Sequence, residues 1–177
     1  MVAKPPVLLH PSPNRNARGV AIDCIVVHTT EGKIAAALDW FGRPESKASA
    51  HFVVAQDGRI FQCVDESMAA WHAGNAVVNH RSIGIELEGH CEIPAMFTGP
   101  LMDSLGALCR YLCATYQIPA DRAHIFGHCD VPTPHHPGEF GGANHHTDPG
   151  PFFKWADLFD RLRSLNPPPA GEAGIKE

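Results

Sequence analysis

Apolar residues fall into short continuous runs and into helical spacings along the chain. The first run, at residues 22–28, is rich in β-branched side chains and predicts a strand that is buried on both faces. Similar runs predict further strands at residues 51–55, 60–64, 82–87 and 123–127. The Asp57-Gly58 turn joins two of these strands into a predicted hairpin.

Apolar residues at helical spacing predict helices in three further segments. The clearest begins near Gly99-Pro100 and ends before Pro119, and its apolar face consists of Leu101, Leu105, Leu108, Leu112 and Tyr116. The other two are residues 31–41 and a last helix that Pro151 opens. Because strands and helices are mixed without strict alternation, we expect an α/β fold with a central mixed β-sheet flanked by helices.

The chain divides into three parts by composition. Residues 1–20 form an extended N-terminal lead-in, residues 21–165 a single domain, and residues 166–177, rich in proline and charge, a disordered tail. The first residues lack the apolar segment of a signal peptide, and no apolar stretch is long enough to predict a membrane span. We therefore expect synthesis in the cytoplasm and a monomeric protein.

Charge and cysteine content exclude some classes of function. The formal net charge is −5 and basic residues form no continuous stretch, which disfavours a nucleic-acid partner. The six cysteines form no CxxC pair, so they are interpreted as small core residues and not as a closed structural zinc site. Histidine is the anomaly: six of the 12 lie within the 23 residues from His124 to His146.

Some polar residues occupy positions that favour a preorganised site. His28 and His128 each follow an apolar strand, Glu86 lies inside one, and Asp148 precedes the start of a helix. Two histidines and one carboxylate can bind zinc and leave a fourth position for water, which another carboxylate can deprotonate. The long separations form no local motif, however, so unrelated polar residues at strand ends are the alternative.

Six segments in order resemble the N-acetylmuramoyl-L-alanine amidase family. They lie between residues 22 and 160 and are Ile25–Thr30, Ser49–Val54 with Asp57-Gly58, Ala70–Gly74, Arg81–Leu87, Gly127-His128 and His146–Pro151. The resemblance implies an enzyme that binds one zinc ion in an open groove and hydrolyses the amide bond between the muramic acid lactyl group and L-alanine. Its substrate is peptidoglycan or a muropeptide.

The resemblance also assigns residues to roles. It implies His28, His128 and Asp148 as the zinc ligands and Glu86 as the catalytic base. His146 stands where family members often have a lysine that stabilises the oxyanion. His51, Trp71 and His72 match positions that line the substrate groove, and His72 is expected to contact the scissile peptide. Phage relatives place a catalytic tyrosine where this chain has Ala50, so Glu86 must carry the base role alone.

Several alternatives stay open from the sequence. Cys129, Asp130 and His145 are rival ligands, although strand neighbours of His128 are expected to face away from it. Glu88 is a rival base, and His135 and His136 are expected to be solvated.

The biological setting is open as well. The protein acts either in the cytoplasm, as a muropeptide-recycling enzyme, or on the cell wall after release, as a phage-type endolysin. Short loops before His51 favour an open groove and a polymeric substrate. A non-catalytic peptidoglycan-binding module of the same fold is the alternative to an enzyme, but binding alone would not require the zinc ligands and Glu86.

Overall fold

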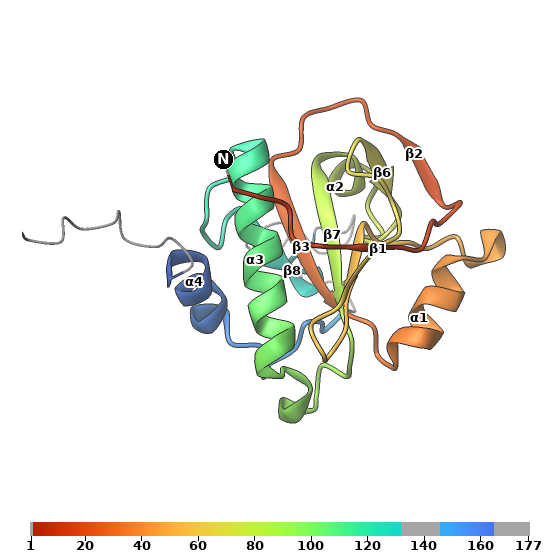
Figure 1. Cartoon of the computed structure of the whole chain (residues 1–177). Helices are drawn as coiled ribbons and strands as arrows, with labels where there is room; N and C mark the ends of the chain where they lie inside the picture. Colours follow the sequence, from red (N-terminus) through yellow and green to blue (C-terminus); the bar gives the residue numbers. More distant parts are fainter. Residues whose placement is uncertain (1, 132–145, 165–177) are drawn as a thin grey trace, which may run out of the picture.

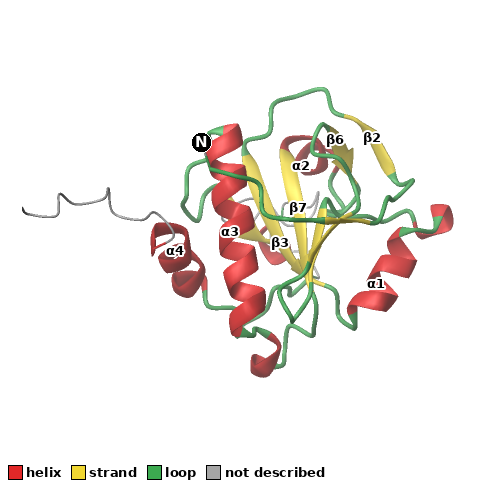
Figure 2. Cartoon of the chain, viewed as in Figure 1, coloured by secondary structure: helices red, strands yellow, loops and turns green. Residues whose placement is uncertain are grey.

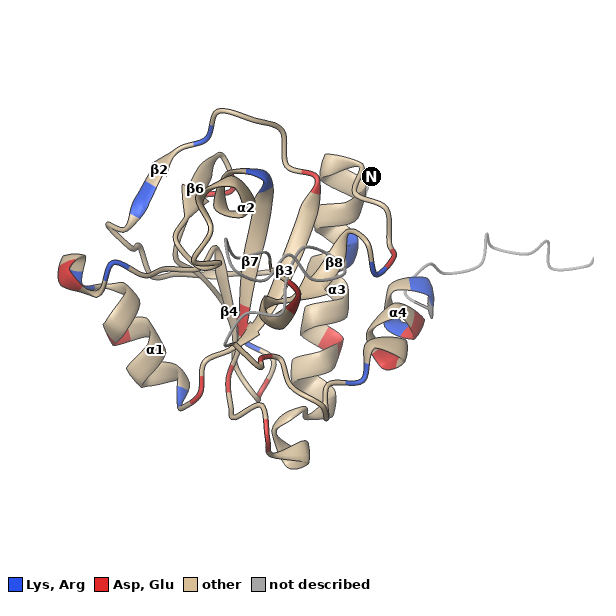
Figure 3. Ribbon diagram, turned by 180° about the vertical axis from the view of Figure 1, so that it is seen from behind, with Lys and Arg blue, Asp and Glu red and all other residues tan. Residues whose placement is uncertain are grey.

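The computed structural model describes residues 2–131 and 146–164 (Figure 1). The predicted tail at residues 166–177 and most of the histidine-rich loop, including His135, His136 and His145, lie outside the described residues. No helix in the described part of the chain is long and apolar enough to cross a membrane. Acidic and basic positions are interspersed over the described ribbon (Figure 3).

A mixed sheet of six strands forms the centre of the described structure (Figure 2). Its order is β1 (Leu8–Leu9), β5 (Ile60–Gln62), β4 (Phe52–Val54), β7 (Ser82–Leu87), β3 (Cys24–Thr29) and β8 (Ile125–Gly127). The β4–β5 pair is antiparallel and the other neighbours are parallel. The sheet confirms the predicted fold class, and the β4–β5 pair confirms the hairpin.

Helices cover the sheet. They are α1 (Ile34–Phe41), α2 (Ala76–Arg81), α3 (Gly99–Tyr116) and α4 (Trp155–Ser164). The predicted apolar face of α3 packs on the sheet, where Leu105 and Leu108 lie in one buried cluster with Ile25 and Ile85, and α4 lies beside α3 (Figure 1). Single 3-10 turns occur at Pro44–Ser46, Pro94–Met96 and His128–Asp130.

The first 20 residues contribute two short strands where only extended chain was expected. Strand β1 joins the edge of the main sheet, and β2 (Arg15–Ala17) pairs with β6 (Met68–Ala70) in a separate antiparallel ribbon. The half-buried Arg18 donates hydrogen bonds to the carbonyl oxygens of Met68 (2.6 Å) and Ser82 (3.0 Å). The N-terminal segment is therefore bonded to the domain that follows it.

The two faces of the central strands have different chemistry. Ile25 and Val27 of β3, with Ile83 and Ile85 of β7, belong to the cluster under α3. Because side chains alternate along a strand, the intervening residues point to the other face. Parallel pairing there sets His28 beside Glu86 at the carboxyl ends of β3 and β7.

Candidate metal centre

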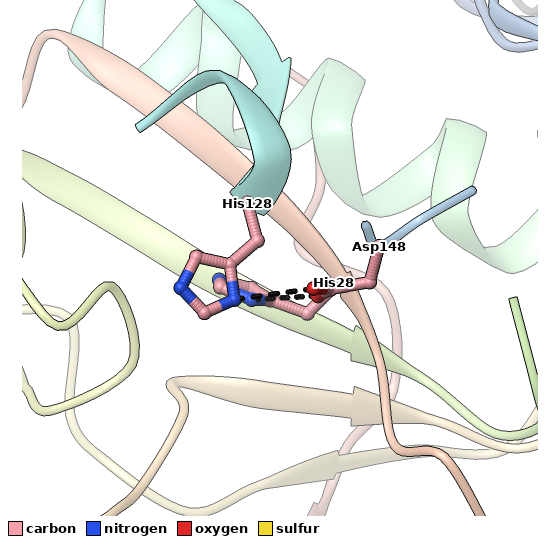
Figure 4. Close-up of side chains that lie close together, drawn as sticks. All are labelled: His28, His128 and Asp148. Carbon is pink, nitrogen blue, oxygen red and sulfur yellow. Dashed lines mark ion pairs between the residues drawn. The ribbon is translucent and has the colours of Figure 1, made fainter. Parts of the chain in front are cut away.

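The three sequence-predicted ligands come together from three separate segments (Figure 4). His28 is near the end of β3, His128 directly follows the neighbouring strand β8, and Asp148 lies in the turn before α4. All three residues are buried, and one ligand atom from each lies within 4.8 Å of the other two. They meet at the carboxyl ends of parallel strands, where α/β sheets place their ligand sites.

Each histidine lies at a distance from the Asp148 carboxylate that two ligands of one zinc ion can have. His28 Nδ1 lies 3.2 Å from Asp148 Oδ2, and His128 Nδ1 lies 3.3 Å from Asp148 Oδ1. Atoms that bind a tetrahedral zinc ion at about 2.0–2.1 Å lie about 3.3–3.4 Å from one another. Two imidazoles and one carboxylate are also the donor set of catalytic zinc sites with an open position.

The site favours an anionic Asp148 and a neutral His28. Burial opposes ionisation of Asp148, but the nearby His128 and His28 side chains outweigh it and hold the pKa of this carboxyl well below its usual range. Burial also lowers the pKa of His28 to about 4, despite the opposing effect of the nearby Asp148 carboxylate. Zinc binds the deprotonated forms of both residue types, so the protein holds these ligands in the state that a metal requires.

Gly127 allows the segment that carries Asp148 to approach the end of β8. A Cβ atom at Gly127 would lie 2.5 Å from Pro149 Cδ and 3.2 Å from the carbonyl oxygen of Asp148. That same carbonyl accepts a hydrogen bond from the backbone N–H of Cys129 (3.0 Å). Any larger residue at position 127 would push the third ligand away from the other two.

The rival ligands next to His128 are engaged elsewhere. Residues His128–Asp130 form a 3-10 turn and not a strand, so the expected alternation of faces does not apply. Asp130 Oδ2 accepts hydrogen bonds from Gly127 N (2.9 Å) and from the Arg122 guanidinium (2.9 Å). Cys129 and Asp130 are absent from the described group of residues that can hold a metal.

Glu86 lies beside the ligands with an unpaired carboxylate oxygen. Its Oε2 atom is buried and has no hydrogen-bond partner among the described residues. Burial, together with the negative charges of Asp148 and Glu31, raises the pKa of Glu86 to about 8. A carboxylate that is destabilised in this way is a stronger base than an exposed one.

Glu88, the rival base, has both carboxylate oxygens occupied. Its Oε1 atom accepts from the backbone N–H of Ile34 (3.1 Å), at the first turn of α1. Its Oε2 atom accepts from the backbone N–H of Gln56 (2.9 Å). The structure therefore gives Glu88 the role of anchoring α1 and the chain after β4, and leaves Glu86 as the candidate base.

His146 packs on the metal ligand His128. The two rings are stacked, with centroids 3.7 Å apart and planes 18° apart. A cavity of about 490 Å³ adjoins His146. It is lined by Glu31, residues 90–93, and residues 146–148. A substrate in this cavity would lie next to His146 and the candidate ligand Asp148.

Two of the three residues that were expected to contact the substrate are buried, and their contact with substrate stays a prediction. His51 is fully buried, its Nδ1 accepts from Gly84 N (2.9 Å), and its Nε2 faces the Met68 carbonyl oxygen (3.1 Å). His72 is buried against His28 and Ser82. In the described structure, both nitrogens of each ring lie at hydrogen-bonding distance from protein atoms.

Trp71 differs from these two histidines. It is partly exposed, and its indole N–H donates to Asn16 on β2. A contact between Trp71 and substrate remains a proposal.

Sequence reasoning missed Ser82 and Gly84, which lie behind the site. Both are small residues at alternate positions of an otherwise apolar strand in which Glu86 is the last but one residue. That alternation was the available signal, because it places the three residues on one face.

Comparison with known proteins identifies the family of this chain. The profile of the N-acetylmuramoyl-L-alanine amidase family matches residues 18–151. N-acetylmuramoyl-L-alanine amidase A of Achromobacter lyticus is 26% identical over 168 residues, which are 85% of this chain and 89% of that protein. The 1,6-anhydro-N-acetylmuramyl-L-alanine amidase AmpD of Salmonella typhimurium is 37% identical over 125 residues. That match covers 67% of this chain and 57% of the relative.

A solved structure has the same fold. It is the N-acetylmuramyl-L-alanine amidase AmiD of E. coli in complex with anhydro-N-acetylmuramic acid-L-Ala-D-gamma-Glu-L-Lys. AmiD is 27% identical, with a TM-score of 0.65 over 83% of this chain and 60% of that chain. Together with the profile match, which spans all three ligand positions and Glu86, these likenesses show that the chain belongs to the N-acetylmuramoyl-L-alanine amidase family.

Proposed function

We propose that the protein is a zinc-dependent amidohydrolase that cleaves the bond between the lactyl group of N-acetylmuramic acid and L-alanine. The observation that carries this proposal is the buried group of His28, His128 and Asp148, whose ligand atoms lie within 4.8 Å of one another, next to a buried carboxylate oxygen of Glu86 that has no partner among the described residues. Membership of the amidase family supports the type of bond. A binding module would need neither the ligands nor the base.

His28, His128 and Asp148 would hold the metal. A zinc ion held there would supply polarisation of a substrate carbonyl and a lower pKa for a bound water molecule. Glu86 takes the proton of the attacking water and delivers it to the nitrogen of L-alanine as the amide bond breaks. A pKa near neutrality suits a group that must both accept and release a proton at neutral pH.

His146 is the candidate oxyanion donor. Its ring is stacked on that of His128 and lines the adjacent cavity, so it lies close to the metal ligands. One ring N–H can donate to the carbonyl oxygen as negative charge develops there. Stacking on a metal ligand fixes the plane of the ring, which a preorganised donor requires.

For the substrate, we propose a soluble anhydro-muropeptide in preference to the polymeric wall. The AmpD relative is named for the 1,6-anhydro-N-acetylmuramyl-L-alanine bond, and AmiD is complexed with an anhydro-muropeptide. The cavity beside the ligands, about 490 Å³, is in the size range of sites for small ligands. We give these observations more weight than the short loops before His51, which favour a polymeric substrate.

The experiment compares two substrates. Zinc-loaded protein is incubated with a soluble anhydro-muropeptide or with intact sacculi, and newly formed amino-terminal L-alanine is measured. We expect release from both to require Glu86 and to be faster from the soluble fragment, with Glu86→Gln as the inactive control. Faster release from sacculi would contradict the proposed substrate, and cleavage without a new L-alanine amino terminus would contradict the proposed reaction.

A further inference from the structure

His72 lies behind the metal ligand His28 as part of a chain of hydrogen bonds. His28 Nε2 lies 3.0 Å from His72 Nδ1, and His72 Nε2 lies 3.1 Å from Ser82 Oγ. Ser82 Oγ donates in turn to the backbone carbonyl oxygen of Val78 (2.6 Å). These residues are all buried, and their hydrogen bonds connect Val78 of α2 to the nitrogen of His28 that faces away from Asp148.

The surrounding sequence makes room for the His72 ring and holds its backbone. A Cβ atom at Gly84 would lie 2.4 Å from His72 Cγ, so the ring packs directly on the glycine backbone. Asn79 Oδ1 accepts hydrogen bonds from the backbone N–H groups of His72 (3.2 Å) and Ala73 (2.8 Å). His72 therefore has a defined place between β7 and α2.

The Val78 carbonyl oxygen determines which atom donates in each hydrogen bond from Ser82 to His28. A carbonyl oxygen only accepts, so the single hydroxyl hydrogen of Ser82 must point to Val78. Ser82 Oγ is then the acceptor for a proton on His72 Nε2. A neutral His72 with that proton accepts at Nδ1, so His28 must donate from Nε2.

The consequence falls on the metal-binding nitrogen of His28. With the proton on Nε2, the Nδ1 atom of a neutral imidazole carries a lone pair. This atom lies 3.2 Å from the Asp148 carboxylate, so a cation between them is needed to make the contact favourable. In the competing arrangement, His28 carries its proton on Nδ1 and donates it to Asp148. His28 Nε2 and His72 Nδ1 would then both be acceptors, and the hydrogen bond between them would be lost.

We propose that His72 and Ser82 are positioning residues that hold His28 in the tautomer that binds zinc. Neither residue touches the metal or the substrate; both act through His28. The inference rests on the proposed zinc site. It also explains why a histidine in a matched family segment is buried.

The test removes the Ser82 hydroxyl and measures zinc affinity by competition with a chelator. In Ser82→Ala, His72 loses the acceptor that fixes its tautomer, so His28 can place its proton toward Asp148. We expect about tenfold weaker zinc binding, at the lower end of the effects of residues behind a metal ligand.

Ser49→Ala is the matched control. Ser49 is also a buried serine, whose hydroxyl donates to the Asn14 carbonyl oxygen (2.6 Å) and accepts from Trp71 N (2.9 Å). Its removal costs a comparable set of hydrogen bonds without touching His28, so zinc affinity should match that of wild type. Equal zinc affinity of Ser82→Ala and wild type would overturn the inference.

A second readout uses the unmodified protein and does not depend on a variant folding. Nitrogen-15 spectra of the zinc-loaded protein should show His72 protonated at Nε2 and unprotonated at Nδ1. The opposite tautomer would overturn the inference while leaving the proposed function standing. Wild-type protein that binds no zinc would instead contradict the proposed function, and the inference with it.

Discussion

Two glutamates at the end of β7 have carboxylates in different surroundings. Glu86 has a buried oxygen with no described partner, whereas Glu88 accepts from two backbone N–H groups. Glu86→Gln is expected to keep zinc and fold but to lose at least about a hundredfold in turnover, the scale of a general base. Glu88→Gln should lower stability more than turnover, because only one acceptor oxygen remains.

Kinetics and zinc content of both variants check this assignment. Wild-type turnover in Glu86→Gln, or a larger loss of turnover in Glu88→Gln with zinc still bound, would show that the base is assigned to the wrong glutamate.

His146 is tested by two substitutions of different chemistry. His146→Ala removes an oxyanion donor and should cost about 2.7–4 kcal/mol of transition-state stabilisation. His146→Lys supplies a donor again and should retain substantial activity. We expect this order in kcat/KM measured over a broad pH range. Because His146 also stacks on His128, zinc content must be measured in parallel; an Ala variant with full zinc and full activity would assign the ring no catalytic role.

At the scale of single residues, the sequence identified the candidate metal ligands but not the burial of the two histidines behind them. The ligand set could be predicted because each ligand follows a strand or precedes a helix and because the segments resemble a known family. The burial of His51 and His72 could not, because it depends on Arg18, Gly84 and α2 packing around them. A sequence motif alone does not show whether its histidine faces solvent or the core.

A carboxylic acid on a strand that is otherwise buried affects the stability of the whole element. All residues of β7 except Glu86 are buried, and burial raises the pKa of Glu86 to about 8, compared with about 4.3 in an unfolded chain. Between these values the folded state binds more protons than the unfolded state. The contribution of Glu86 to stability is therefore complete below the unfolded pKa and is lost as the pH rises toward 8.

Glu86→Gln removes this titration from the metal-free protein. Relative to wild type, the Gln variant should gain stability steadily as the pH rises from about 5 to about 8. Denaturant unfolding of both metal-free proteins across this range provides the measurement. A difference in unfolding free energy that is independent of pH would show that the Glu86 pKa is not raised by folding.

Elements with a long apolar pattern could be predicted from the sequence, and so could the three-residue strands β4, β5 and β8, which lie inside longer apolar runs. Strands β1, β2 and β6 and helix α2 could not. Strand β7 has the predicted bounds, and the apolar face of α3 is the predicted one. Strands β1, β2 and β6 have two or three residues, too few for a period, and α2 has six. Their positions depend on pairing with distant segments, which periodicity does not report.

At the scale of the molecule, Arg18 joins the N-terminal segment to the parts that surround the site. Its guanidinium donates to the carbonyl oxygens of Glu66, His80, Met68 and Ser82. Arg18→Ala should lower the free energy of unfolding by about 3 kcal/mol or more, since hydrogen bonds to a charged group contribute about 1.5–3 kcal/mol each. Thermal and denaturant unfolding measure this loss, and a change below about 0.5 kcal/mol, typical of a surface substitution, would contradict the role given to Arg18.

The mixed sheet could be predicted as a class, but its strand order could not. Local patterns predict that strands exist, whereas the order β1-β5-β4-β7-β3-β8 depends on contacts between distant segments. That order creates the site, since it puts Glu86, His28 and His128 on three adjacent strands or directly after them.

Metal dependence of amide hydrolysis tests the account most directly. The protein is freed of metal, its metal content is verified by elemental analysis, and release of amino-terminal L-alanine from an anhydro-muropeptide is followed while zinc is added. We predict no hydrolysis without metal and full recovery at one zinc ion per chain, with no recovery when His28 is replaced by alanine. Full hydrolysis by verified metal-free protein would contradict the zinc mechanism.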